Sequence, residues 1–107
     1  MQNQTRKTML LEMLVKEPND VFLNYALAME MIGNSEFANA EAQLQKVLLL
    51  NSEYLPCYYQ IGQLKEKLND TIGAIEFYKK GIALAKLQNN TKAMGELNEA
   101  LWMLDDE

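Results

Sequence analysis

The residues that enzymes use for acid–base and nucleophilic chemistry are scarce in this chain. It contains no histidine, which removes histidine-based catalytic pairs and the commonest zinc ligand. The single cysteine, Cys57, shares an apolar helical stripe with Ile61 and Leu64 and is interpreted as a buried, unreactive thiol. We find no spaced acid–base pair, phosphate-binding loop or metal cluster. We therefore expect no catalytic residues, no cofactor and no bound metal, and hence not an enzyme.

Two charged clusters have simple interpretations. The acidic run at 105–107 could attract a divalent cation loosely, but a frayed acidic tail is the better interpretation, since acids beyond a helix C-terminus oppose its dipole. Glu76, Lys79 and Lys80 have helical spacing, which indicates a solvated face with charge pairs.

The composition is that of one globular domain. Of the 107 residues, 49% are hydrophobic and 23% charged, and the net charge is −5. The negative charge argues against nucleic acid and anionic membranes as partners. No apolar run is long enough to span a membrane, and the N-terminus does not resemble a secretory signal. A lone cysteine fits a reducing compartment, so we expect a cytoplasmic protein.

Apolar residues recur at helical spacing along the whole chain, which predicts six helices and no strand. The first ends before Pro18, the second runs from an Asp20 cap to Gly33, and Ser35 is expected to cap the third. Pro56 fits the first turn of the fourth, and Asp70 or Thr71 the start of the fifth. The residues 88–91 are expected to break the chain between the fifth helix and the sixth. The expected apolar faces include Leu68 in the fourth helix, Ile72 in the fifth, and Met94, Leu97, Leu101 and Leu104 in the sixth.

A shift of 34 residues places Val21–Tyr54 over Leu55–Gln88. Internal repeats of this length indicate stacked helical hairpins. The shift aligns four identical pairs, Tyr25/Tyr59, Ala40/Ala74, Lys46/Lys80 and Leu50/Leu84, and four pairs of similar character, Leu27/Ile61, Ala28/Gly62, Leu44/Tyr78 and Leu48/Ile82.

These positions resemble the tetratricopeptide repeat, whose 34-residue unit is a helix–turn–helix with large and small residues at set places. The second unit matches at Tyr58, Ile61, Gly62, Ala74, Tyr78 and Gly81, and the first at Leu27, Ala28, Met31, Ala40, Leu44 and Val47. The resemblance implies an all-α superhelix of antiparallel helix pairs with a right-handed twist. It also implies an N-terminal half repeat at 1–20, repeats at 21–54 and 55–88, and a C-terminal capping helix at 89–107.

Glycine inside a helix costs roughly 1 kcal/mol relative to alanine, so Gly62 and Gly81 need a reason. We expect close packing, with Gly62 where the helices of one repeat cross and Gly81 where the second helix meets its neighbour. Three residues depart from the family pattern: Asn24 holds a large aromatic position, Lys65 replaces a tyrosine, and Gly33 precedes the usual turn glycine by two residues.

The resemblance implies a concave surface formed by the first helix of each repeat. Independently, the helix after Asp20 carries two apolar stripes, of which the core needs only one. Carried over by position, the partner-binding residues are Phe22, Tyr25, Met29 and Ile32 in the first repeat, and Pro56, Tyr59, Gln63 and Glu66 in the second.

The predicted function is to bind a protein or peptide in this groove, with Tyr25 and Tyr59 as anchors and Met29 as an adaptable contact. One alternative is that neighbouring helices cover the second stripe. Another is a homodimer or larger homo-oligomer whose groove its own partner chain occupies. The family's basic clamp for an acidic peptide tail is not expected here, because Tyr25, Met29, Tyr59 and Gln63 stand in its positions. Trp102 either shields the edge of the fifth helix or marks an oligomer contact.

Overall fold

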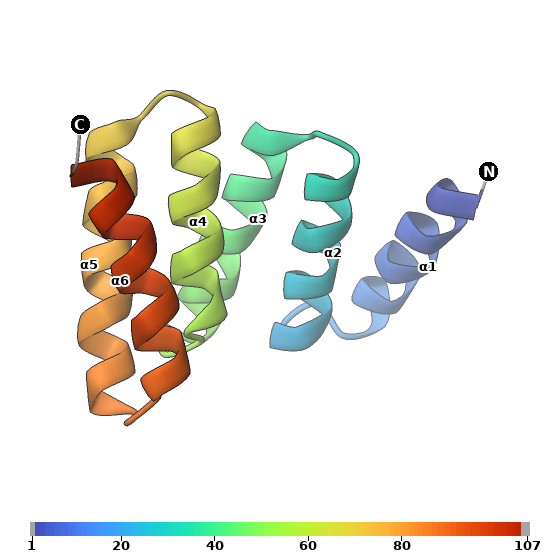
Figure 1. The fold of residues 1–107 in the computed structure, drawn as a ribbon. Helices are drawn as coiled ribbons and strands as arrows, with labels where there is room; N and C mark the ends of the chain where they lie inside the picture. Colours follow the sequence, from blue (N-terminus) through green and yellow to red (C-terminus); the bar gives the residue numbers. More distant parts are fainter. Residues whose placement is uncertain (1, 106–107) are drawn as a thin grey trace. The chain divides into compact units, whose positions relative to one another are not determined.

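The computed structural model describes residues 2–105, and within that range it contains six helices and no strand, which confirms the predicted all-α class. The helices are α1 (Gln2–Lys16), α2 (Val21–Gly33), α3 (Phe37–Leu50), α4 (Pro56–Lys67), α5 (Thr71–Leu87) and α6 (Thr91–Asp105) (Figure 1). They form two compact units, Met1–Ser52 with α1–α3 (unit 1) and Glu53–Glu107 with α4–α6 (unit 2). None of the helices in the described range is long and apolar enough to cross a membrane.

Each unit contains an antiparallel hairpin of helices, α2 with α3 and α4 with α5. In unit 1, α1 packs on α2, and in unit 2, α6 packs on α5. The buried apolar residues, most of them on the predicted helix faces, are Leu27, Ala28, Ala40, Leu44 and Val47 in unit 1, and Leu55, Cys57, Ile61, Leu64, Ala74, Tyr78, Ala85 and Leu97 in unit 2. Full burial of one such leucine or isoleucine contributes about 1.5–3 kcal/mol, so these faces hold each unit together.

The same turn follows α2, α4 and α5. Ser35, Asn69 and Asn89 have φ values of 62°, 64° and 55°. The next residue's N–H donates to a carbonyl five residues back, in the pairs Glu36–Met31, Asp70–Lys65 and Asn90–Ala85. This is the Schellman arrangement that satisfies the last carbonyls of a helix. Ser35 and Asn69 are 34 residues apart, as the shifted alignment requires.

Helix starts mostly use the predicted caps. The Asp20 carboxylate accepts from Leu23 N at 2.8 Å, the Asp70 carboxylate from Gly73 N at 2.9 Å, and the Asn90 side chain from Ala93 N at 3.0 Å. Pro56 opens α4. Such caps satisfy helical N–H groups that lack an internal partner.

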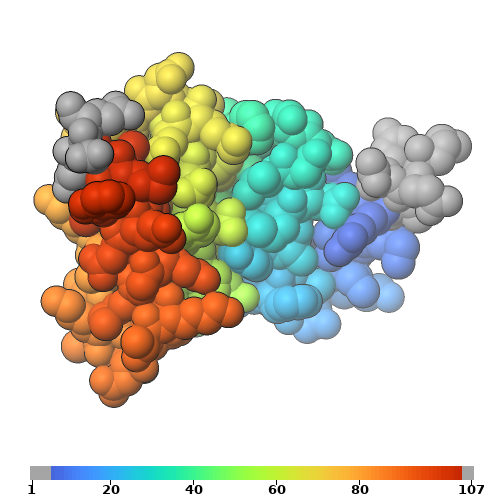
Figure 2. Space-filling view, viewed as in Figure 1, coloured from blue at the N-terminus to red at the C-terminus, as the bar shows by residue number. Residues whose placement is uncertain are grey.

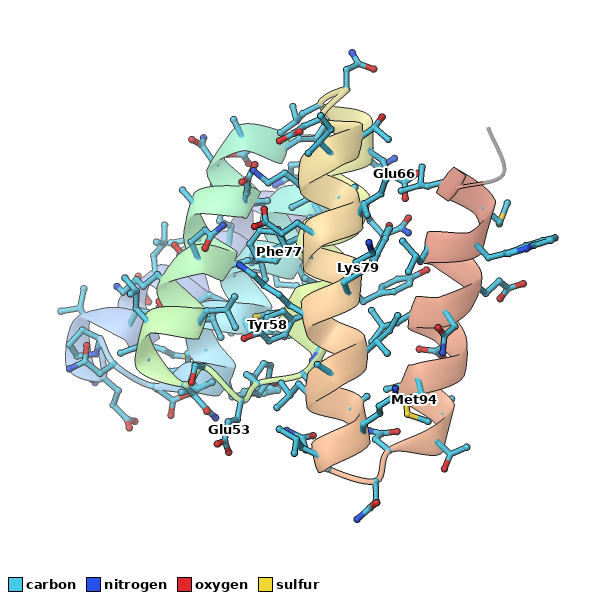
Figure 3. The ribbon with its side chains drawn as sticks, turned by 90° about the vertical axis from the view of Figure 1, so that its left-hand side faces the viewer. Glu53, Tyr58, Glu66, Phe77, Lys79 and Met94 are labelled. Atoms are coloured by element: carbon cyan, nitrogen blue, oxygen red, sulfur yellow. The ribbon has the colours of Figure 1, made fainter. Side chains whose placement is uncertain are left out.

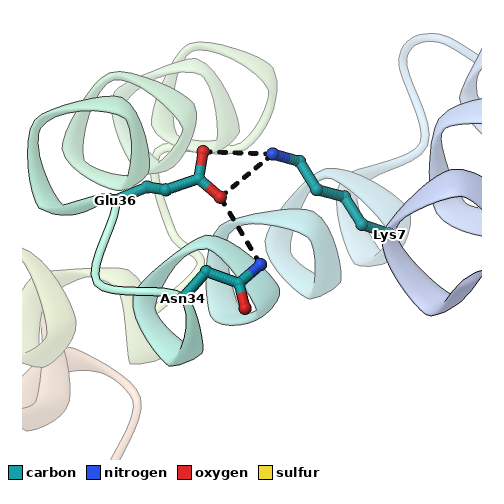
Figure 4. A network of polar contacts seen from close by, with 3 residues as sticks. All are labelled: Lys7, Asn34 and Glu36. Carbon is teal, nitrogen blue, oxygen red and sulfur yellow. Dashed lines mark hydrogen bonds and ion pairs between the residues drawn. The ribbon is translucent and has the colours of Figure 1, made fainter. Parts of the chain in front are cut away.

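The expectation for Ser35 is wrong. It occupies the left-handed turn position, and the N-cap of α3 is Glu36, whose side chain makes no capping hydrogen bond. Glu36 instead accepts from Lys7 Nζ at 3.0 Å and from the Asn34 side chain at 3.4 Å (Figure 4). This pair fastens α1 to the turn between α2 and α3.

Two predicted positions of apolar side chains are also wrong. Ile72 is 83% exposed and Leu68 41% exposed, because both flank the reversal at Asn69, where none of the described helices covers them. Trp102 is 68% exposed, which goes against the first of its two interpretations, the shielding of α5. The acidic run at 105–107 lies outside the side chains that are described.

Both predicted close approaches are present. A Cβ added to Gly62 would overlap the ring of Tyr78, which is fully buried. A Cβ added to Gly81 would lie 2.9 Å from Tyr58 Cβ and 3.0 Å from Leu97 Cδ1. Gly81 therefore lets α4 and α6 both close onto α5, and this sets the position of the site described next.

Candidate functional site

A groove in unit 2 is bordered by α4 and α6. One face of α4 carries Tyr59, Gln63 and Glu66, which follow the three-to-four-residue spacing of a helical stripe. On α6, Glu96, Glu99 and Met103 form a second stripe, turned away from the core residue Leu97. Figure 2 views unit 2 from the side on which α4 (yellow-green) and α6 (orange to red) lie at the surface.

One end of the groove is mainly apolar. It is a hollow of about 310 Å³ lined by Leu55, Pro56, Tyr59, Gln60, Asn90, Lys92, Ala93, Glu96 and Leu97. Pro56 stiffens the first turn of α4 at this end, because its ring pre-sets the helical φ. A hollow of this composition can accept an apolar side chain.

The other end is acidic. It is a hollow of about 280 Å³ lined by Tyr59, Gln63, Glu66, Glu96, Glu99, Ala100 and Met103. Tyr59 and Glu96 line both hollows, so the two hollows adjoin, and together they are called the groove. Three carboxylates border the acidic end, and no lysine or arginine is among its lining residues.

A buried hydroxyl orients two of these groove residues. The Gln63 side chain donates to the Tyr78 hydroxyl at 2.7 Å, and that hydroxyl donates to the Glu66 carboxylate. Burial, followed by the hydrogen bond to Glu66, raises the pKa of Tyr78 above its ordinary value, so the hydroxyl keeps its proton. In Figure 3, Glu66 lies toward α6, on the opposite side of α5 from Phe77.

Tyr78 also supports the third groove residue of α4. The rings of Tyr59 and Tyr78 are tilted at 43° with centroids 6.2 Å apart, a favourable aromatic geometry. Thus Tyr59, Gln63 and Glu66, which were predicted as partner-binding residues, meet around one buried side chain.

In unit 1, the predicted residues lie on α2. Phe22 is 68% exposed, whereas Tyr25, Met29 and Ile32 are partly buried. Phe22 lines a hollow of about 300 Å³ together with Met13, Lys16, Glu17, Asp20 and Leu23. The second stripe of α2 is therefore neither fully covered nor fully open.

Two further interpretations from the sequence concern a thiol and a charged face. Cys57 is buried, and burial raises its thiol pKa to about 12, which confirms the expected unreactive thiol. Glu76 and Lys80 are exposed and pair at 3.9 Å, as expected of a solvated face. Within the described residues, no group of three His, Cys, Asp or Glu side chains is placed to hold a metal ion.

The contribution of α6 to the groove was not predicted from the sequence. The helix was expected only to cap the stack, yet Glu96, Glu99 and Met103 form half of the acidic end. The available signal was their spacing of three and four residues on the face away from Leu97, Leu101 and Leu104.

Comparison with known proteins identifies the family. No protein-family model matches the chain, and no curated protein matches it. Among solved structures, the tetratricopeptide repeat domain protein from Salinibacter ruber is 31% identical, with a TM-score of 0.77. The match covers 81% of this chain and 97% of that chain. The fold and site define an α-helical repeat protein. The chain belongs to the tetratricopeptide repeat family.

Two more distant structures share the fold. PcrH, solved in complex with the chaperone-binding region of PopD, has a TM-score of 0.90 at 12% identity, covering 98% of this chain and 80% of that one. The first repeat domain of Spaghetti (RPAP3), solved with the HSP90 peptide SRMEEVD, has a TM-score of 0.78 at 21% identity, covering 97% and 81%.

Proposed function

We propose that this chain is a protein-interaction module that binds a peptide or protein segment on its helical surface, and that the groove between α4 and α6 is the principal contact in unit 2. The sharing of Tyr59 and Glu96 by an apolar and an acidic hollow carries this proposal. Concave sites with a few oriented polar groups are the usual form of ligand sites. The complexes of PcrH and RPAP3 with peptide partners support the same use of the fold.

Unit 1 contributes its own contacts under this proposal. Phe22, Tyr25, Met29 and Ile32 supply apolar area on α2, and Phe22 already stands in solvent. Methionine and tyrosine suit this role because one adapts its shape and the other offers rigid area with a polar tip. The net charge of −5 favours a protein partner over nucleic acid or an anionic membrane. A reducing, cytoplasmic setting remains our proposal for a chain with one buried thiol.

The test uses peptides selected from a random library on the immobilised chain. Tyr59→Ala removes the side chain common to both ends of the groove, so we expect about a tenfold loss of affinity or more. Leu87→Ala is the matched control, because it removes an exposed apolar side chain of the same unit outside the groove. Affinity is measured by fluorescence polarisation and folding by thermal denaturation. Selection of no peptide, or equal loss in both variants, would contradict the proposal.

Tyr25→Ala and Met29→Ala test the unit 1 surface. Both should weaken binding more than they lower thermal stability, since neither side chain is fully buried. If both changes unfold unit 1 and leave peptide affinity unaltered, the stripe belongs to the core.

A second candidate is a homo-oligomer whose groove holds its own partner chain. Trp102 and Met103, at 68% and 63% exposure, favour it, because they place adjacent apolar area on α6 beside the groove. Sedimentation at several concentrations separates the candidates. A monomer at all concentrations removes the oligomer, and a dimer lost in Trp102→Ser supports it.

A further inference from the structure

The carboxylates of the groove differ from many others in the chain in lacking a cation. Elsewhere, Glu30 pairs with Arg6 at 3.3 Å, Glu36 with Lys7 at 3.0 Å, and Asp70 with Lys65 at 3.6 Å. Glu96 and Glu99 have no hydrogen-bond or ion-pair partner among the described residues, and both are exposed. Glu66 is held by the Tyr78 hydroxyl, which carries no charge. Lys92 lines the adjoining apolar end together with Glu96 but forms no ion pair with it, so the acidic end keeps an excess of negative charge.

A metal ion is a poor occupant for this charge. The three glutamates are not placed as a metal-holding group in the described structure. A Lys or Arg side chain is better suited, because it reaches separated carboxylates through several donors on a long stem. Its apolar stem would also pack against Met103 and Ala100, which line the same hollow.

We infer that the groove selects a peptide segment with a cationic and an apolar side chain, the cation lying among Glu66, Glu96 and Glu99 and the apolar side chain entering the hollow beside Pro56 and Leu97. This inference rests on the proposed function and adds the chemistry of the partner. Charge complementarity of this kind governs specificity and association rate more than raw affinity.

The geometry also sets the spacing of the two side chains. Pro56 of the apolar end and Glu66 of the acidic end are ten residues apart on α4, which at 1.5 Å per residue separates them by about 15 Å. An extended segment covers that length in about four to five residues. The selected peptides should therefore carry Lys or Arg about four to five residues from a Leu, Met, Phe or Tyr.

The experiment selects phage-displayed random peptides of about twelve residues, long enough to span both ends, on the full chain. Enrichment of the cationic–apolar pair at that spacing is the expected result. Enrichment of neutral or acidic peptides would overturn the inference, and if their binding still depends on Tyr59, the proposed function stands. Loss of all Tyr59-dependent binding would overturn both.

A matched pair of variants tests the charge directly. The double variant Glu96→Gln/Glu99→Gln should weaken a selected cationic peptide about fivefold or more, since each exposed charge pair is worth a factor of about two to five. The control Glu12→Gln/Glu76→Gln changes the net charge equally at exposed positions outside the groove and should leave affinity unchanged. Both variants keep Glu66, because that carboxylate holds Tyr78.

Salt and self-association complete the test. Raising NaCl from about 50 to about 500 mM should weaken the wild-type complex several-fold and the Gln double variant much less, because screening acts on exposed charges. Equal weakening of both proteins would contradict the inference. A concentration-dependent dimer that excludes the peptide would identify a second copy of the chain as the occupant and overturn it.

Discussion

Units 1 and 2 use the same hairpin and turn but bury different polar side chains. In unit 1, Asn24 of α2 is fully buried, and in unit 2, the buried hydroxyl belongs to Tyr78 of α5. Asn24 donates to the carbonyls of Pro18 and Asp20 at 3.0 and 2.8 Å and accepts from Gln43 at 2.6 Å. One buried polar group thus ties the chain entering α2 to α3, whereas the other orients a groove.

The 34-residue shift shows that the two hairpins fill the space between their helices with side chains of different size. It pairs Leu44 with Tyr78 on the second helices and Ala28 with Gly62 on the first. The larger second-helix residue occurs with the smaller first-helix residue, and the Tyr78 ring lies where a Gly62 side chain would be. Fully packed interiors require such compensation, since an added methyl group has no space to occupy.

The largest expected effect comes from removing that compensation with Gly62→Ala. The Tyr78 ring cannot move aside easily, because it is fully buried and its hydroxyl is held by Gln63 and Glu66. We expect unit 2 to lose about 2–3 kcal/mol of unfolding free energy, despite alanine's better helix propensity. Urea denaturation followed by Trp102 fluorescence measures this, because the only tryptophan lies in unit 2.

A double variant provides the control. Gly62→Ala with Tyr78→Leu recreates the small–large pairing of unit 1, so its loss should be less than the sum of the two single losses. Strict additivity would show that the two residues do not compete for space. The reverse change in unit 1, Ala28→Gly, should cost about 1 kcal/mol through helix propensity.

A second prediction concerns the polar centre of unit 1. Asn24→Ala removes three hydrogen bonds at once and leaves Gln43 without its short partner, so we expect a loss of about 2 kcal/mol. Gln43→Ala should cost about half as much, since Asn24 keeps both backbone carbonyls. Far-UV circular dichroism under urea follows the helices of both units and measures the two losses relative to the wild type. Equal losses for the two variants would mean that the hydrogen bond between Gln43 and Asn24 supplies the whole stabilisation and that the bonds from Asn24 to the backbone carbonyls supply none.

Much of this fold follows from local sequence signals. Asp20, Pro56 and Asp70 begin helices as expected, because capping and proline geometry depend on a few adjacent residues. The glycines at 62 and 81 indicated close packing, and the packed atoms are there. Apolar periodicity succeeded for the helix centres, where each face meets a neighbour.

The errors lie where the outcome depends on tertiary neighbours. Leu68 and Ile72 fit their helical stripes, but the chain reverses between them and leaves both in solvent. The spacing of Glu96, Glu99 and Met103 marks an outward face of α6, but it does not indicate that this face lies beside α4 and completes the acidic end of the groove. Ser35 was predicted as the N-cap of α3, but that position belongs to Glu36, and Ser35 is the left-handed residue before it. A serine in the left-handed conformation has no distinctive sequence signature.

The turn itself supplies a third, smaller prediction. Unit 1 places Ser35 at the left-handed position where unit 2 has Asn69, and asparagine tolerates that conformation better. Ser35→Asn should stabilise unit 1 by about 0.5 kcal/mol, and Asn69→Ser should destabilise unit 2 by a similar amount. Thermal denaturation of both variants measures the pair. A loss on Ser35→Asn would contradict the strain assigned to this position.

The smallest effect concerns the residue after that turn. Asp70 caps α5, whereas Glu36 leaves α3 uncapped and pairs with Lys7. The hydrogen bond and charge of Lys7, opposed by desolvation, hold the pKa of the Glu36 carboxyl below its ordinary value of 4.5. Because the folded pKa is lowered, the stabilisation is present above pH 4.5 and is lost as the pH falls through the folded value. Lys7→Met should move the Glu36 pKa back up, as measured by carboxyl carbon NMR, whereas Arg6→Met should leave it in place because Arg6 pairs with Glu30. An unchanged Glu36 titration in Lys7→Met would mean that α1 is not fastened to the turn by this pair.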